Sequence, residues 1–427
     1  MGVQLAATTM SREAGFLQGI SLVLPVTLSV MGIAAFTATV AMMQDHFSYL
    51  AHGEYLVGLL QTMPAFWIVV FSPIAGWLAD RYGRRPNLIL AMLIHTVAGV
   101  MPYFLENMGL ILTTRCFVGI SESMILICTS TLLCDYFHNK ERNRWLAAQT
   151  GAATLSSLLI IWIGGVLGAK FGWHGPFLLY LSSLPLVAAV LAFTWEPARD
   201  SAQVGEESDA NVRYHTLPWA RLLGIAAISV LGSISFYTTI TQNAIALKIL
   251  GVTAPKLVGQ FSAFASIGVA IGSIVFSAVG RLGIGGLLSI EFLLIGVGFT
   301  GMGNSATPMY YALAANIQQI GCGMMLPTLL VWATRGLSHE IRARGIGLWQ
   351  GSFSIGLFVS AGLLTYLARQ FGGLFSAFEA FGKISVAAAL FTVVAHFGFA
   401  RRRVFNRSQP GSVFALLHEK SKGKETQ

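Results

Sequence analysis

The sequence predicts an all-α membrane protein of twelve transmembrane helices, arranged as two pseudo-symmetric bundles of six. Of its 427 residues, 55% are hydrophobic and only 11% are charged, whereas soluble domains carry roughly 25% charged residues. Apolar stretches of about 20 residues, the length that crosses a hydrocarbon core, recur along nearly the whole chain. The charged residues of the two halves also repeat at a constant offset, which indicates two related bundles.

The expected spans follow one another with short polar connections. They cover residues 17–43, 55–78, 87–104, 110–134, 145–168, 175–195, 219–246, 256–279, 284–303, 307–332, 342–368 and 374–399. Each is predominantly apolar and long enough to cross the membrane, so each is predicted to be one helix.

These spans divide the chain into five parts. A cytoplasmic N-terminus (1–16) precedes the N-terminal bundle (17–195), and a linker (196–218) rich in Asp, Glu, Ser and Arg leads to the C-terminal bundle (219–400). Residues 401–427 form a basic tail, which is also predicted to be cytoplasmic. Two parallel six-helix halves are a known way to build a transporter whose binding site lies between them.

The positive charges predict the orientation. Most of the 27 Lys and Arg residues fall in loops that share a side with both termini, and short basic loops face the cytoplasm. We therefore expect a multi-pass protein of the cell (inner) membrane with both termini cytoplasmic. The same topology explains the net charge of +9, so no nucleic-acid partner is expected.

An internal repeat links two separate loops. Arg81 and Gly83 recur 200 residues later as Arg281 and Gly283. At the same offset, Arg142, Arg144 and Gly151 recur as Arg342, Arg344 and Gly351. One shared offset across two loops predicts that the halves have the same fold.

The loop after the second span reads GWLADRYGRRP, residues 76–86, and combines one acid with arginines and glycines. Gly76 and Gly83 would allow close backbone approach. Asp80 can accept hydrogen bonds from Arg84 or from the amide end of a neighbouring helix, where an anion is favoured. A positively charged inside loop would explain Arg81 and its neighbours but not the acid.

This string resembles the signature loop of the major facilitator superfamily, and the resemblance covers about residues 17–400. It implies secondary transport and a charge network that latches the halves in the outward-facing state. The matching residues are Asp80, Arg84 and, at the end of the fourth span, Asp135. The second half has only GRLG at 280–283, without an acid, so its latch is expected to be weaker.

The fourth span contains Arg115 and Glu122, seven residues or about two helical turns apart and therefore on one stripe. The string RCFVGISES at 115–123 resembles the Arg-x-x-x-Gly pattern of many members of this family. Intramembrane charges are costly and are usually functional. Either the stripe faces a central cavity, with Arg115 holding an anionic group or tuning Glu122 and with Glu122 carrying a coupling proton, or the two residues form a structural pair. Gly119 between them would admit a neighbouring helix.

Three carboxylates lie within spans, which shortens the list of proton carriers to Glu122, Glu291 and Glu379. Glu379 precedes Lys383 by four residues, a spacing that favours an ion pair within a helix. Glu291 is also interpreted as structural, so Glu122 is the first candidate.

Polar and aromatic residues in other spans are candidates for binding the solute, although helix-to-helix hydrogen bonds would equally satisfy them. They are Gln61, Tyr237, Gln242, Asn243, Asn316, Gln319, Trp349 and Gln350. Gly164 and Gly165 resemble part of an antiporter motif, but Ile160 and Ile161 replace the Gly-Pro that normally precedes the pair. Close helix packing is the other reading of these glycines and of GVAIGS at 268–273.

The sequence lacks the phosphate-binding loops and the HExxH motif of common enzyme classes, so we expect no enzyme, no metal and no cofactor, with a proton gradient as the driving force. The expected partners are a small organic substrate and the lipid bilayer, and we expect a monomer. Open alternatives are export of drug-like compounds, uptake of an organic anion such as an aromatic acid or siderophore, spinster-like lipid transport, and a non-transporting membrane sensor. Against lipid transport, the first span lacks the acid that spinster-like carriers tend to have.

Overall fold

The structure is a computed structural model that describes residues 14–197, 216, 218–335, 337 and 339–407. Most of the predicted N-terminus, linker and tail therefore lies outside the described residues. The described chain is almost wholly helical. The first half contains α1 (Phe16–Val23), η1 (Leu24–Thr27), α2 (Leu28–Ala34), α3 (Val40–His46), α4 (Gly53–Tyr82), α5 (Arg84–Val100), η2 (Met101–Phe104), α6 (Met108–Tyr136), α7 (Asn139–Phe171), η3 (Gly172–Ser182) and α8 (Ser183–Phe193). The second half contains α9 (Trp219–Ile249), α10 (Pro255–Val279), η4 (Gly280–Leu282), α11 (Gly283–Gly303), α12 (Pro308–Thr334), α13 (His339–Gln370) and α14 (Leu374–Arg407).

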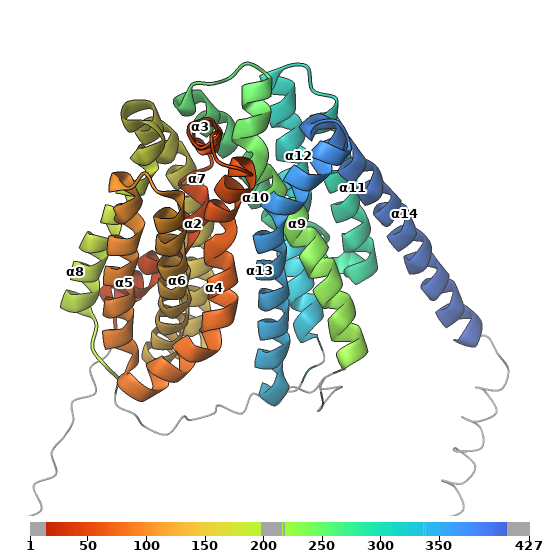
Figure 1. Ribbon diagram of the computed structural model, residues 1–427. Helices are drawn as coiled ribbons and strands as arrows, with labels where there is room; N and C mark the ends of the chain where they lie inside the picture. Colours follow the sequence, from red (N-terminus) through yellow and green to blue (C-terminus); the bar gives the residue numbers. More distant parts are fainter. Residues whose placement is uncertain (1–13, 198–215, 217, 336, 338, 408–427) are drawn as a thin grey trace, which may run out of the picture.

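The helices form two bundles that stand side by side, α1–α8 in one and α9–α14 in the other (Figure 1). Ten stretches of described residues are long and apolar enough to cross a membrane. One of them, Lys140–Phe193, contains two expected spans, and α12 supplies another crossing that is uncharged but carries three amide side chains. The predicted fold of twelve spans in two bundles is confirmed.

The predicted repeat is visible in the helix bounds. α6 begins at Met108 and α12 at Pro308, while α7 begins at Asn139 and α13 at His339. The halves therefore repeat at the same offset as the arginines. They meet where α4 packs on α13 and α7 on α10. Gly165 permits the second contact, because a Cβ there would lie 2.7 Å from the carbonyl oxygen of Pro255.

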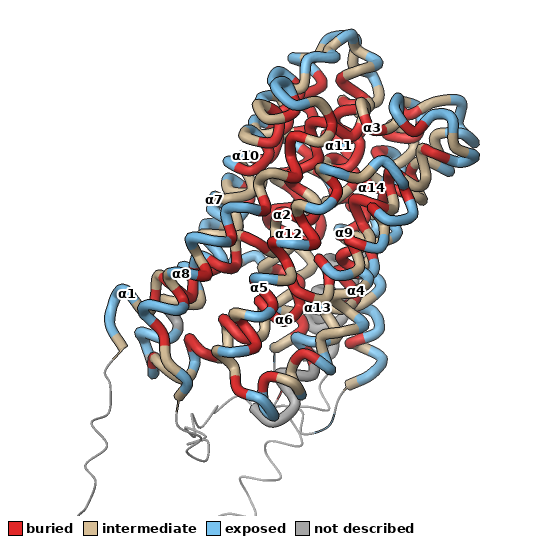
Figure 2. The backbone as a smooth tube through the Cα atoms, turned by 60° about the vertical axis from the view of Figure 1, so that its left-hand side comes forward, coloured by how far each residue is buried: buried red, intermediate tan, exposed pale blue. Residues whose placement is uncertain are grey.

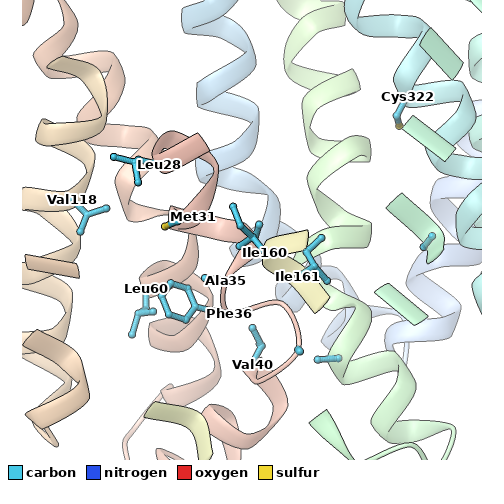
Figure 3. Packing of buried hydrophobic residues seen from close by; sticks show 14 of the residues in the cluster. Leu28, Met31, Ala35, Phe36, Val40, Leu60, Val118, Ile160, Ile161 and Cys322 are labelled. Carbon is cyan, nitrogen blue, oxygen red and sulfur yellow. The ribbon is translucent and has the colours of Figure 1, made fainter. Parts of the chain in front are cut away.

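The first span differs from the single helix expected over residues 17–43. It is divided into α1, η1, α2 and α3, with a turn between Ala34 and Val40. Pro25 has no backbone N–H to donate, and the hydroxyls of Thr37 and Thr39 bond to nearby carbonyls at 3.3 Å, which competes with regular helix formation. Figure 3 shows the apolar side chains of this segment packed near Leu60, Val118 and Ile160.

Buried positions lie along the facing sides of the helices and exposed positions along the outer sides (Figure 2). Many exposed positions are large and apolar, as surfaces in contact with lipid must be. Examples are Val97, Leu159, Ile274 and Leu390.

Ion pairs join the bundles at one end of the molecule, which we call the Lys248 end. Lys248 Nζ lies 2.5 Å from Asp45 Oδ1, and Arg369 pairs with Glu54. Each pair connects one residue of α1–α8 with one of α9–α14. At the opposite end, called the Asp80 end, the described ion pairs lie within the N-terminal bundle. These ion pairs therefore join the two bundles at the Lys248 end.

Candidate functional site

Glu122 is the buried carboxylate of α6, and only 1% of its surface is exposed. Its neighbour is Gly32 of α2, where a Cβ would lie 2.8 Å from Glu122 Oε1. That oxygen accepts no hydrogen bond from the described residues, and none of their ion pairs includes Glu122. A buried carboxylate oxygen without a hydrogen-bond donor is costly unless a proton or a cation satisfies it.

Arg115 lies on the same stripe of α6 as Glu122, two helical turns earlier, but its contacts are different. Its Nη1 donates to the Tyr180 hydroxyl at 2.9 Å, and its Nη2 donates to the Ala98 carbonyl at 3.4 Å. The guanidinium carbon is 5.2 Å from the ring centroids of Phe36, Phe177 and Tyr180. We call this arrangement the arginine cage.

The arginine cage shows that Arg115 and Glu122 do not form the structural ion pair that was the alternative expectation. The guanidinium is fully buried within the N-terminal bundle, and it forms no ion pair with Glu122. Its two Nη groups donate within that bundle, whereas its Nε–H is buried without an acceptor among the described residues. Its positive charge is close enough to Glu122 to interact electrostatically, and the binding of an anionic group by Arg115 stays a prediction.

Two side chains of α4 contact the helices on either side of Glu122 and Gly32, one on α2 and the other on α6. Gln61 Nε2 donates to the Ile33 carbonyl at 3.4 Å, and its Oε1 has no partner among the described residues. Trp67 packs on Gly119, where a Cβ would lie 2.8 Å from the tryptophan Cβ, and its buried indole N–H is also without an acceptor there. The close helix approach predicted at Gly119 is confirmed.

An aromatic group lies in the other bundle. One of its members, Tyr237 of α9, is within electrostatic range of Glu122. Its ring centroid is 5.8 Å from that of Phe353 in α13, which in turn lies 6.1 Å from that of Trp349. The indole N–H of Trp349 has no acceptor among the described residues. These rings belong to the C-terminal bundle and Glu122 to the N-terminal bundle, and a site formed by both stays a prediction.

The remaining polar candidates divide into two groups. Gln319 donates to the Phe236 carbonyl at 3.1 Å but leaves its Oε1 unpartnered, and buried Gln242 makes no hydrogen bond within the described chain. Asn243 instead accepts from Tyr311 at 2.8 Å, and Asn316 donates to the Phe264 carbonyl at 2.8 Å. The hydrogen bonds of those two asparagines join helices of the C-terminal bundle. This is the helix-to-helix bonding that was the alternative to binding the solute. Gln350 is exposed.

The other two intramembrane acids lie away from this site. Glu291 is fully buried between α11 and α12, where its Oε1 accepts from the Thr328 hydroxyl at 2.5 Å. Glu379 pairs with Lys383 at 2.7 Å, as its spacing predicted. Glu291 Oε2, like Glu122 Oε1, has no hydrogen-bond partner among the described residues.

The signature loop forms a charge network at the Asp80 end. Arg84 pairs with Asp135, and its Nη2 lies 3.9 Å from Asp80. Arg81 stacks on Trp77, with its guanidinium carbon 5.2 Å from the ring centroid. These contacts match the residues that the family resemblance implied, and all of them lie within the N-terminal bundle.

A different acid occupies the helix amide end expected for Asp80. Glu196 accepts hydrogen bonds from the backbone N–H groups of Arg84 and Arg85, both at 2.7 Å, and so caps α5. Gly83 precedes the helix with φ +97°, a conformation that favours glycine. Gly76 has open space where a Cβ would be, so no close approach requires it.

Sequence reasoning missed four contributors to these sites. Trp67 and Phe353 looked like ordinary apolar residues of spans, and the only signal for Trp67 was the glycine opposite it. Tyr180 is 65 residues from Arg115, and no spacing indicates that contact. Glu196 was visible as an acid directly after the sixth span.

Comparison with known proteins gives a consistent result. The model of the Major Facilitator Superfamily matches residues 22–315. The sphingosine-1-phosphate transporter SPNS2 of Danio rerio is 32% identical over 155 residues, which is 35% of this chain and 31% of that protein. Human protein spinster homolog 1 is 29% identical over 230 residues, 49% and 42% of the two chains. The class H tetracycline resistance protein of Pasteurella multocida is 27% identical over 155 residues, 36% and 38% of the two chains. These matches span less than half of each relative.

Solved structures share the fold at low identity. A bacterial homologue of the human lysosomal transporter Spinster, in an inward-facing and unoccupied conformation, aligns with a TM-score of 0.68 at 18% identity, covering 92% of this chain and 98% of that one. A mutant of the nucleoside transporter NupG aligns with a TM-score of 0.71 at 13% identity, covering 89% and 99%.

Proposed function

Because the chain belongs to the major facilitator superfamily and is a multi-pass transporter of that type, we propose that it moves a small organic solute by alternating access, driven by a proton gradient. It is a transporter and not an enzyme. The solute binds between the bundles, and Glu122 takes up and releases the coupling proton.

The observation that carries this proposal is the position of Glu122. Its carboxylate is buried where α6 meets α2, with an unpartnered oxygen and no ion-pair partner among the described residues. Ionising such a group is costly, so we expect it to exchange a proton or a cation whenever its surroundings change. Rocking of the bundles would present this one group first to one side of the membrane and then to the other.

The proposed orientation places the Asp80 end and both termini in the cytoplasm of a monomer in the inner membrane. The basic loops support this orientation. The ion pairs at the Lys248 end then close the outer side, and the network of Asp80, Arg84 and Asp135 engages the second bundle only when the molecule opens outward. No cofactor takes part in this cycle.

Flux in proteoliposomes tests the proposal. A thermal-shift screen of the purified protein, with organic cations, aromatic acids and lysophospholipids as probes, first identifies a stabilising compound. We expect uptake of that compound to follow an imposed pH gradient, and Glu122→Gln to reduce the gradient-driven rate at least tenfold. Glu291→Gln is the matched control, because it neutralises an equally buried acid away from the site, and it should retain the rate.

Two results would contradict the proposal. Gradient-driven flux that persists in the Glu122→Gln protein would remove this residue from coupling. A compound that stabilises the protein but never crosses the bilayer would favour a sensor.

A further inference from the structure

An apolar groove opens on the lipid-facing side of the N-terminal bundle, where α5 packs against α6. Its volume of about 470 Å³ falls in the range of ligand pockets, and its lining is almost entirely apolar. We call it the α5–α6 groove. Ala98 and Thr114, each 6% exposed, lie at its base. Val97, Leu110 and Phe117, each more than half exposed, lie at its rim.

The two hydroxyls that line the groove offer a ligand no donor. Thr113 Oγ1 donates to the Gly109 carbonyl at 2.9 Å. Thr114 Oγ1 donates to the Ile111 carbonyl at 2.7 Å. Both bonds stay within α6, so neither hydroxyl proton is left over. A polar ligand would give up its hydrogen bonds without regaining them here, so the part of a ligand inside the groove must be hydrocarbon.

The depth of the groove matches one leaflet of the bilayer. Along α5 it extends from Leu93 to Met101, a distance of eight residues or about 12 Å of helix. One leaflet supplies half of a hydrocarbon core that is about 30 Å thick. The groove begins close to exposed Glu106 at the Lys248 end and reaches Phe117 in the membrane. A lipid with its headgroup beside Glu106 therefore has its chain along the groove.

The membrane supplies the occupant, because the rim of the groove is continuous with the exposed apolar surface that contacts acyl chains. Lipid is as apolar as this lining, so close packing and not transfer from water favours binding. An empty groove would lose dispersion contacts along its walls, whereas a flexible chain that fills it gains them. We propose that the α5–α6 groove holds one acyl chain of a phospholipid from the leaflet at the Lys248 end as a long-lived ligand.

The α5–α6 groove and the arginine cage are two sides of one helix contact. The Ala98 carbonyl at the base of the groove accepts from Arg115 Nη2 at 3.4 Å, and Thr114 directly precedes Arg115. A chain in the groove therefore supports the wall of the cage from the lipid side. This phospholipid is a structural ligand that is separate from the transported solute, so the proposal does not depend on the direction or the coupling of transport.

Native mass spectrometry of the full-length protein tests the proposal. The protein is reconstituted in palmitoyl-oleoyl phosphatidylcholine, extracted into detergent and weighed, and the wild type should retain one phosphatidylcholine. Thr113→Trp, which fills the groove with an indole, should reduce the retained fraction at least fivefold. Phe117→Ala, which removes part of the rim, should also reduce it. Leu159→Trp is the matched control, because it adds the same ring at an exposed position of α7 outside the groove and should retain the lipid.

A phosphatidylcholine with a diazirine on its acyl chain locates the bound lipid, since its cross-links should fall on peptides of α5 and α6 and be lost in Thr113→Trp. If Thr113→Trp does not fold, Phe117→Ala decides the question alone. No retained lipid in the wild type, or retention that the folded groove variants leave unchanged, would overturn the proposal. Cross-links spread evenly over the exposed apolar surface would overturn it as well, because they would show only exchanging lipid around the protein.

Discussion

Arg115 and Glu122 show how far a single residue can be interpreted from helical spacing. Their separation of seven residues correctly predicted that both are buried in one region of α6. The spacing could not predict their partners, because these lie on other helices: Gly32 beside Glu122, and Tyr180 beside Arg115. A stripe on one helix defines a direction, whereas the role of a charge depends on what the neighbouring helices place there.

The arginine cage predicts that Arg115 stabilises the N-terminal bundle and does not bind the solute. Arg115→Gln removes cation–π contacts that are worth about 0.5–2 kcal/mol each and leaves the Tyr180 hydroxyl without its charged donor. We expect a lower melting temperature in detergent, with gradient-driven flux per folded molecule within about threefold of the wild type. Arg115→Lys, which keeps the charge but not the planar fork, should be intermediate in stability. Unchanged stability together with a tenfold loss of flux would return Arg115 to the transport site.

At the scale of elements, hydropathy predicted where the chain crosses the membrane but not how each crossing is built. The bounds of α9 and α11 agree closely with the expected spans 219–246 and 284–303. The interruptions of the first span arise from Pro25 and from threonine hydroxyls that bond to the backbone. Such local competition hardly changes mean hydropathy, so a search for apolar stretches does not detect it.

Helix capping gives a prediction at this scale. Glu196 accepts the N–H groups of both Arg84 and Arg85 at the start of α5, where an acid also complements the helix dipole. Glu196→Ala should lower the free energy of unfolding by about 1–2 kcal/mol, as the loss of a good cap does. Glu196→Gln keeps an acceptor but no charge and should lose less. Reversible unfolding in mixed micelles measures both, and an alanine variant as stable as the wild type would show that the cap contributes nothing.

For the whole molecule, the repeat of arginines correctly predicted two bundles of one fold, because each half must satisfy the same packing. The sequence could not predict the conformation in which the two bundles meet. Asp45 and Lys248 are 203 residues apart, and Glu54 and Arg369 are 315 apart, so their pairing depends on how the finished bundles meet. The sequence could not predict the proposed binding site for the same reason, since Glu122 and the aromatic group belong to different bundles.

The two ion pairs at the Lys248 end lead to the prediction that they hold that end shut. Exposed pairs contribute up to about 1 kcal/mol each, so removing both would shift the closed-to-open ratio by up to about thirtyfold. Ala361 of α13 reports the change, because it is 1% exposed and packs against Gly58 of α4. In a protein whose four native cysteines are replaced, the cysteine of Ala361→Cys should react slowly with a water-soluble thiol reagent.

Adding Lys248→Ala and Arg369→Ala to that protein should accelerate labelling severalfold, since the closed state loses both of its described ion pairs between the bundles at this end. Lys383→Ala is the matched control. It breaks an ion pair of similar exposure that lies within α14 and joins no bundles, so it should leave the labelling rate unchanged. If the double variant labels no faster than this control, the pairs do not hold the Lys248 end closed, and apolar contacts such as those of α4 with α13 must do so instead.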